Sequence, residues 1–273
     1  MRERGIRAGG PATAAPSSLL NRWWRVAATG FSFAGFGVGG LLLGLVVFPL
    51  LLSVPQRARR AALARRVIHH LFQLFVAMIC GLGLCSLEVR GRERLRRRGL
   101  LILASHPSLI DVVFLMSLVE HADCIVKAAL LRNPFTRGPV RAAGFVCNDS
   151  GAGLLDDCVA SVRAGNNLIV FPEGTRTPAG TALGRLQRGA ANLAVRGALA
   201  ITPVRITCTQ PMLGKNDKWW RVPLRAGHFL IDVGDDIAID PHLARAGAQA
   251  LAARRLTDEL ARHLVAESPH ATA

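Results

Sequence analysis

Two long apolar runs dominate the first third of the chain. The first run covers residues 26–55 and holds no charged residue, and the second covers residues 67–87. With about 1.5 Å of rise per residue, a helix over the first run exceeds the roughly 20 residues that cross a bilayer. Residues 26–87 are therefore predicted to form a membrane-associated two-helix segment, joined by the basic connector QRARRAALARR at 56–66.

The topology of this helix pair has two interpretations. The first run is flanked by the connector and by residues 1–25, an Arg-containing stretch that is predicted to be a flexible tail. The positive-inside rule places Arg-rich segments on the cytoplasmic side of a membrane. A re-entrant or in-plane hairpin keeps both basic segments on one face, whereas two full crossings leave the connector outside.

From residue 88 onward the pattern changes to short apolar runs that alternate with helix-like stretches. Such alternation predicts an α/β domain, here over residues 88–273. The strand-like runs are GLLILAS, DCIVKA, GFVC, NNLIVFPE, AITPVRIT and HFLIDV, and helices are predicted over 108–120, 154–163, 185–196 and 244–265.

The composition excludes a disordered protein and indicates which kinds of partner the chain binds. Hydrophobic residues make up 51% of the chain and the mean hydropathy is +0.31, which excludes an intrinsically disordered protein. The formal charge of +16 comes almost entirely from arginine and favours anionic partners such as phospholipid surfaces. Nucleic acid is not expected, because the basic residues are dispersed and no RNA- or DNA-binding signature is present. Six cysteines without a CxxC pair predict no metal site and suit a cytosol-facing protein.

The motif SHPSLID at 105–111 follows a strand-like run and carries a histidine and an aspartate five residues apart. On one regular helix this offset would turn the two side chains about 140° apart. They meet if His106 lies in the strand-to-helix turn, which Pro107 favours because proline is preferred at the first helical position. Asp111 would then hold one imidazole nitrogen, and the other would take a proton from a hydroxyl at neutral pH. A capping histidine beside an unrelated aspartate is the alternative.

A second polar motif, FPEGTRTP at 171–178, ends the strand-like run NNLIV. Loops at the carboxyl ends of strands are where α/β domains bind ligands. Arg176 is suited to bidentate phosphate recognition, and Thr175 and the Gly174 backbone add donors. Glu173 is interpreted as positioning Arg176 or binding a hydroxyl. A solvated turn with an exposed ion pair is the alternative.

Together, His-x4-Asp after one strand and FPEGTR after another resemble the lysophospholipid acyltransferase superfamily, whose best-known members acylate 1-acylglycerol-3-phosphate to phosphatidate. The resemblance spans roughly residues 87–235. It implies a glycerol-3-phosphate acyltransferase-like mixed α/β sheet flanked by helices, preceded by a membrane-embedded helix pair.

The resemblance also implies roles for individual residues. His106 would be the general base and Asp111 would orient it. Acceptor binding would fall to Glu173, Gly174, Thr175 and Arg176, with Lys127 as a further binding residue; ITPVRI at 201–206 resembles a block linked to acyl binding. The acyl donor would be a thioester of CoA or acyl carrier protein, with no metal or other cofactor. The protein is expected in the cell inner membrane, its catalytic domain facing the cytoplasm.

Two departures from the family pattern affect the expected acceptor. Ser105 replaces the usual asparagine before the histidine, which is a mild change. Asp149 stands where the middle motif usually carries a phosphate-binding arginine, and a carboxylate repels phosphate. Alternative acceptors are therefore a lyso-ornithine lipid, a glycolipid or a polyene lipid. A thioesterase, or a membrane adaptor that has lost its catalytic activity, are further alternatives.

Overall fold

The computed structural model describes residues 19–148, 151–178, 180–210, 212–214, 217–223, 225–239 and 249–265. Within these residues, seven strands form one sheet in the order β1-β7-β6-β2-β5-β3-β4. Neighbouring strands are parallel except β6 and β7, which are antiparallel, so the predicted mixed sheet is confirmed. The strands are β1 (Cys85–Arg90), β2 (Leu101–Ala104), β3 (Ala122–Val126), β4 (Val146–Cys147), β5 (Asn167–Val170), β6 (Ile201–Cys208) and β7 (Gly227–Val233).

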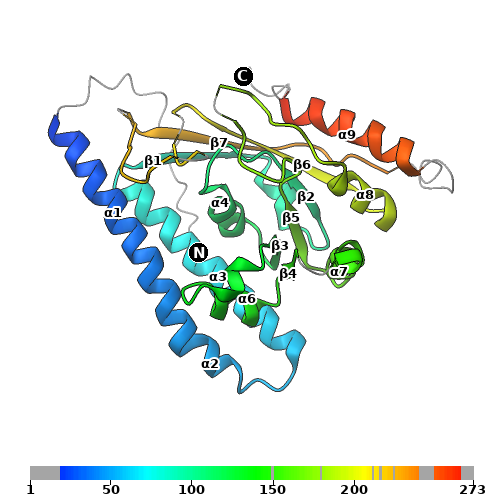
Figure 1. The fold of residues 1–273 in the computed structure, drawn as a ribbon, viewed down its shortest axis with the longest axis horizontal. Helices are drawn as coiled ribbons and strands as arrows, with labels where there is room; N and C mark the ends of the chain where they lie inside the picture. Colours follow the sequence, from blue (N-terminus) through cyan, green and yellow to red (C-terminus); the bar gives the residue numbers. More distant parts are fainter. Residues whose placement is uncertain are drawn as a thin grey trace.

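Helices cover both faces of this sheet (Figure 1). They are α1 (Leu19–Leu42), α2 (Phe48–Leu51), α3 (Arg57–Gly81), α4 (Asp111–Leu118), α5 (Ala129–Arg132), α6 (Arg137–Ala143), α7 (Leu154–Arg163), α8 (Arg188–Gly197) and α9 (Gln249–Val265). Short π or 3-10 turns occupy η1 (Leu43–Val47), η2 (Arg92–Arg96) and η3 (Gly151–Gly153).

The central strand β2 shows why its sequence is apolar at every position. Because side chains alternate between the faces of a strand, Ile102 and Ala104 join a core cluster with α3 and α4. Leu101 and Leu103 join the opposite cluster, with α7, α8 and α9. All four side chains are fully buried, as expected for a parallel strand covered on both sides.

The N-terminal helices differ from their predicted boundaries. Residues 19–25, predicted as the end of a flexible tail, are helical within α1, and residues 1–18 lie outside the described part. The helical path continues through a π turn to Leu51, and α3 begins at Arg57, so the predicted basic connector is mostly helical. The π turn ends at Val47, two residues before Pro49, which cannot donate a backbone hydrogen bond within a helix.

The second apolar run also divides differently from the prediction. Helix α3 ends at Gly81, and Gly83 adopts φ +73°, a left-handed conformation that suits glycine at a helix end. The N–H of Leu84 donates to the carbonyl of Ile79 at 3.1 Å, which closes the helix. Residues 85–87, predicted as membrane-associated, therefore begin the sheet as part of β1.

The two N-terminal helices contact the domain in different ways. Helix α3 packs on it closely: His69 Nδ1 forms a 2.8 Å hydrogen bond with the carbonyl of Met116, and the guanidinium of Arg65 donates to Asp123. In α1, most large apolar side chains face outward, although Trp24 Nε1 donates to the carbonyl of Leu82. Both helical segments, 19–51 and 57–81, are long and apolar enough to cross a membrane by length and composition.

The buried ion pair between α3 and β3 generates a stability prediction. Arg65 Nη2 and Asp123 Oδ2 are 3.1 Å apart, and the two side chains are 8% and 1% exposed. Asp123→Ala removes the only carboxylate that the structure describes beside the buried guanidinium and leaves it a 3.4 Å bond to the Gly144 carbonyl, so the free energy of unfolding should fall by about 3–5 kcal/mol. Denaturant unfolding of the purified protein measures this change.

The matched control is Glu88→Ala, which removes a half-exposed carboxylate paired with Arg90. Exposed pairs contribute about 0–1 kcal/mol, so this variant should unfold nearly like the parent. Equal effects of the two substitutions would contradict a structural role for the buried pair.

Candidate active site

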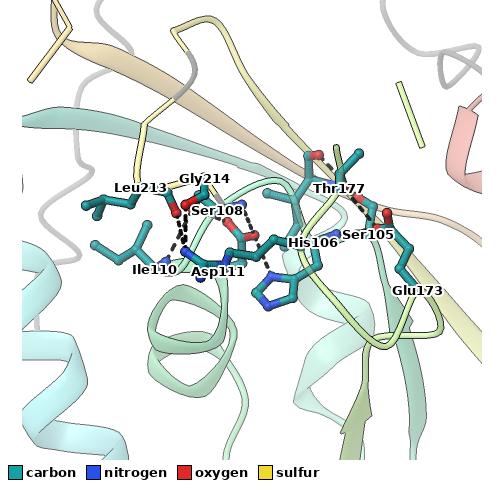
Figure 2. A network of polar contacts seen from close by, with 11 residues as sticks. Ser105, His106, Ser108, Ile110, Asp111, Glu173, Thr177, Leu213 and Gly214 are labelled. Carbon is teal, nitrogen blue, oxygen red and sulfur yellow. Dashed lines mark hydrogen bonds and ion pairs between the residues drawn. The ribbon is translucent and has the colours of Figure 1, made fainter. Parts of the chain in front are cut away.

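The His106 imidazole and the Asp111 carboxylate are in contact (Figure 2). His106 lies in the loop after β2, and Asp111 is the first residue of α4, as the turn prediction required. The Nδ1–H of His106 donates to Oδ2 of Asp111 at 3.0 Å. In this tautomer the proton of the neutral imidazole is on Nδ1, where the carboxylate accepts it in a hydrogen bond. The Nε2 atom therefore keeps its lone pair and is able to take a proton. The imidazole is 15% exposed and the carboxylate is not exposed at all.

Ser108 satisfies the rest of the buried carboxylate. Its backbone N–H donates to Oδ2 of Asp111 and its hydroxyl donates to Oδ1, each at 2.7 Å. Burial raises the pKa of Asp111, while the hydrogen bonds from His106 and Ser108 act in the opposite direction. Three donors fix the position of the carboxylate. The sequence prediction missed Ser108, although Ser-x-x-Asp before an apolar run is the signature of a capping box.

Phe171 is a second residue that the sequence prediction missed. Its ring stacks on the His106 imidazole with centroids 4.1 Å apart and planes 25° apart. Phe171 follows β5, the neighbour of β2 in the sheet, so the two loops emerge side by side at one sheet edge. The stack covers one face of the imidazole and limits rotation of the ring.

The structure places the Glu173 carboxylate between the two motif loops. Its carboxylate is 3% exposed and accepts hydrogen bonds from the backbone N–H of His106 at 2.9 Å, the Thr177 hydroxyl at 2.9 Å and the backbone N–H of Gly184 at 2.7 Å. A side chain held in this way is a positioning residue that joins the two motif loops. The described contacts include none between Glu173 and Arg176, and the burial argues against direct contact with an acceptor.

Arg176 is joined to His106 and Asp111, the catalytic dyad candidate (hereafter the dyad), through the loop after β6. Its Nη1 donates to the carbonyls of Leu213 and Gly214 at 2.9 and 2.8 Å. The same Leu213 carbonyl accepts the backbone N–H of Leu109, in the His106 loop, at 3.1 Å. Figure 2 shows Leu213 and Gly214 beside Ser108 and Asp111. Both of these bonds use Nη1. The Nε and Nη2 donors of Arg176 have no partner among the described residues and are available to a ligand.

The other predicted binding residues lie at the same sheet edge. Gly174 adopts φ +67°, which its lack of a Cβ allows, and its N–H donates to the carbonyl of Phe171 at 3.0 Å in a tight turn. Thr175 is exposed on that turn. Lys127 is exposed just after β3, which is separated from β2 by β5, and no described contact joins it to the dyad. Asp149 lies outside the described residues.

Comparisons with known proteins agree with this arrangement. Residues 86–207 match the family model described as Acyltransferase. A 1-acyl-sn-glycerol-3-phosphate acyltransferase of Pseudomonas aeruginosa is 30% identical over 126 residues, 43% of this chain and 48% of that protein. A chloroplastic 1-acyl-sn-glycerol-3-phosphate acyltransferase of Arabidopsis thaliana is 26% identical over 152 residues, 53% of this chain and 42% of that protein. The chain thus spans about half the length of these curated relatives.

A solved structure is similar over nearly the whole chain. The crystal structure of the 1-acyl-sn-glycerophosphate acyltransferase of Thermotoga maritima has a TM-score of 0.66 and 18% sequence identity. The match covers 91% of this chain and 98% of that one. At this identity the likeness establishes the fold alone.

The role of Glu173 generates a prediction. Glu173→Gln replaces one carboxylate oxygen, a hydrogen-bond acceptor, with an amide N–H₂ group, which is a donor. In one orientation this group faces the Gly184 N–H, and in the other it faces the His106 N–H and the Thr177 hydroxyl, so a donor meets a donor in both. An unsatisfied buried donor costs about 1–3 kcal/mol, so the free energy of unfolding should fall by that amount. Denaturant unfolding measures it.

Glu120→Gln is the control, because Glu120 is exposed and the same change there alters no recorded side-chain bond. An unfolding curve of Glu173→Gln that coincides with that of Glu120→Gln would remove the positioning role.

Proposed function

We propose that the chain is an O-acyltransferase of the 1-acylglycerol-3-phosphate acyltransferase-like superfamily, which the match of residues 86–207 to the Acyltransferase family model and the curated relatives support. It moves a fatty acyl group from an acyl thioester to a hydroxyl of a lysophospholipid, with 1-acylglycerol-3-phosphate as the acceptor. The observation that carries the proposal is the hydrogen bond between His106 Nδ1 and the buried Asp111, which leaves Nε2 free to act as a base.

The proposed chemistry is a direct transfer. His106 Nε2 takes the proton of the acceptor hydroxyl as its oxygen attacks the thioester carbonyl carbon. The C–O bond forms, the C–S bond breaks, and the leaving thiolate takes the proton back from the imidazolium. Asp111 stabilises that imidazolium while remaining ionised. The thioester, of CoA or acyl carrier protein, is a co-substrate, and these steps use no other cofactor.

Arg176 supports a phosphate-bearing acceptor. A guanidinium binds phosphate in a bidentate manner, and its Nη1 bonds to the Leu213 and Gly214 carbonyls fix its orientation next to the dyad loop. The names of the curated relatives point to the same acceptor. Acylation of a lyso-ornithine lipid, a glycolipid or a polyene lipid in preference to 1-acylglycerol-3-phosphate would contradict this assignment.

The proposal includes action at a membrane surface. In the most apolar 18-residue stretch of the helical segment 19–51, only 6% is buried inside the protein. Large apolar side chains of this segment, such as Leu20, Trp23 and Phe31, are more than half exposed. Trp219 and Trp220, in the loop after β6, are also exposed. The ring centroid of Trp219 lies 6.2 Å from that of Phe33 in α1. Tryptophan prefers the headgroup level of a bilayer. We place the protein at the cell inner membrane with the catalytic domain on the cytoplasmic side.

Substitutions of the dyad test the reaction. His106→Ala removes the base and should lower kcat with 1-acylglycerol-3-phosphate and acyl-CoA, or acyl carrier protein thioester, by about 10²–10⁴-fold. Asp111→Asn should produce a loss of the same order, because an amide does not hold the Nδ1–H tautomer in the same way. Mass spectrometry of phosphatidate formed on lipid vesicles measures both.

Vesicle binding by His106→Ala serves as the control and should match the parent protein. Transfer by His106→Ala at the parental rate would contradict the general-base role. Free fatty acid as the main product of the parent protein would favour a thioesterase instead.

The exposed tryptophans generate a separate prediction. Trp220 is 49% exposed, and the ammonium of Lys218 lies 5.2 Å from its ring centroid. Trp220→Ala should weaken binding to anionic phospholipid vesicles about fivefold, for a loss of about 1 kcal/mol of apolar burial. Co-sedimentation measures this affinity.

Leu251→Ala is the comparison, since Leu251 is 50% exposed on α9, on the face of the sheet opposite to α3. It should leave vesicle affinity unchanged. An equal loss in both variants would show that the tryptophan does not mark the lipid-facing surface.

A further inference from the structure

A pocket of about 370 Å³ opens where the start of α8 meets α9. Three arginines line it: Arg185, just before the helix; Arg188, its first residue; and Arg254, from α9. The remaining polar lining consists of Gln187, Thr257 and Asp258. The pocket therefore carries three guanidinium groups and one carboxylate. Its size falls within the range of small-molecule sites.

The three guanidinium groups are not engaged elsewhere in the described structure. No hydrogen bond or ion pair is recorded between any of them and another described residue. By contrast, Arg196, near the end of the same helix, pairs with Asp156 at 2.8 Å. Unpaired arginines that line one pocket create a positive potential, which attracts a polyanion. Guanidinium groups also bind phosphate oxygens in pairs and stack on aromatic bases.

The pocket is joined to the candidate active site through the backbone. The N–H of Gln187 donates to the carbonyl of Pro172 at 2.7 Å, directly before Glu173. The N–H of Gly184 donates to the Glu173 carboxylate, which also holds the N–H of His106. The wall of the pocket therefore continues into the loop that carries Arg176. A donor with a long flexible arm can place its anionic end in the pocket while its thioester reaches His106.

We propose that this pocket binds the phosphorylated nucleotide end of a CoA thioester. The inference rests on the proposed acyl transfer and specifies its donor. The arginines would pair with the pyrophosphate and the ribose phosphate, and Asp258 would accept a hydrogen bond from the adenine amino group. The three arginines are exposed at a pocket of about 370 Å³, which can hold a nucleotide end; binding of an acyl carrier protein by the same arginines is the outcome that the test distinguishes.

The test compares two donors that differ only in the nucleotide. The parent protein and the double variant Arg188→Ala/Arg254→Ala are assayed with palmitoyl-CoA and with palmitoyl-pantetheine, which lacks the nucleotide. The KM for palmitoyl-CoA should rise about tenfold in the variant, with kcat within twofold of the parent. The KM for palmitoyl-pantetheine should not change. Arg196→Ala, which removes an arginine of α8 outside the pocket, should behave as the parent with both donors.

Equal changes in KM for the two donors, or no change for either, would overturn the assignment. Palmitoyl-acyl carrier protein is assayed as a third donor, and a loss by the double variant that appears only with this donor would also overturn the assignment.

Calorimetric binding of CoA separates this inference from the proposed function. CoA that binds the parent protein but binds the double variant at least tenfold more weakly supports the pocket, even if no acyl transfer occurs. Equal CoA affinity in the two proteins overturns the pocket, even if acyl transfer is observed.

Discussion

A carboxylate buried without any exposure is costly unless every oxygen is satisfied, and the Asp111 carboxylate is in this position. It is satisfied by the Nδ1–H of His106 and by the backbone N–H and hydroxyl of Ser108. These bonds force the loop after β2 to turn back over the start of α4. The same bonds leave His106 Nε2 as the free acceptor, so local stability and reactivity have one origin.

A second buried carboxylate, that of Glu173, extends this constraint across the sheet edge. It binds the backbone of His106 and the loop leading to α8, while Arg176 and Leu109 share the Leu213 carbonyl. Loops after β2, β5 and β6 are thereby fixed to one another. In contrast, α1 exposes most of its apolar side chains, which suits an element that contacts lipid. The proposed reaction needs both properties: a rigid base and an apolar surface through which a lysolipid arrives.

Much of this arrangement could be predicted from the sequence. The continuous apolar runs identify buried strands such as β2 and β5, and the predicted helix over 154–163 coincides with α7. A strand-to-helix turn predicts the contact between His106 and Asp111, but Pro107 does not stand at the first helical position, because α4 begins at Asp111. The boundary near residue 85 could not be located by hydropathy, because an apolar helix and a buried strand follow each other there.

The role of Glu173 could not be predicted for a different reason. Its decisive partner is the backbone N–H of His106, 67 positions away, and backbone donors have no sequence signature. The pairing of Phe171 with His106 likewise depends on the adjacency of β2 and β5. Motifs specify which side chains are present, whereas strand order decides which of them meet.

The protonation state of the His106 ring tests the account most directly. Nitrogen-15 NMR of histidine-labelled protein, above the pH at which imidazole titrates, distinguishes the two ring nitrogens, and a His106→Ala spectrum assigns the signal among the eight histidines. We expect Nδ1 to carry the proton and Nε2 to be bare, with this preference lost in Asp111→Asn. A proton on Nε2 in the parent protein, or a spectrum unchanged by Asp111→Asn, would contradict the assignment of His106 as the base.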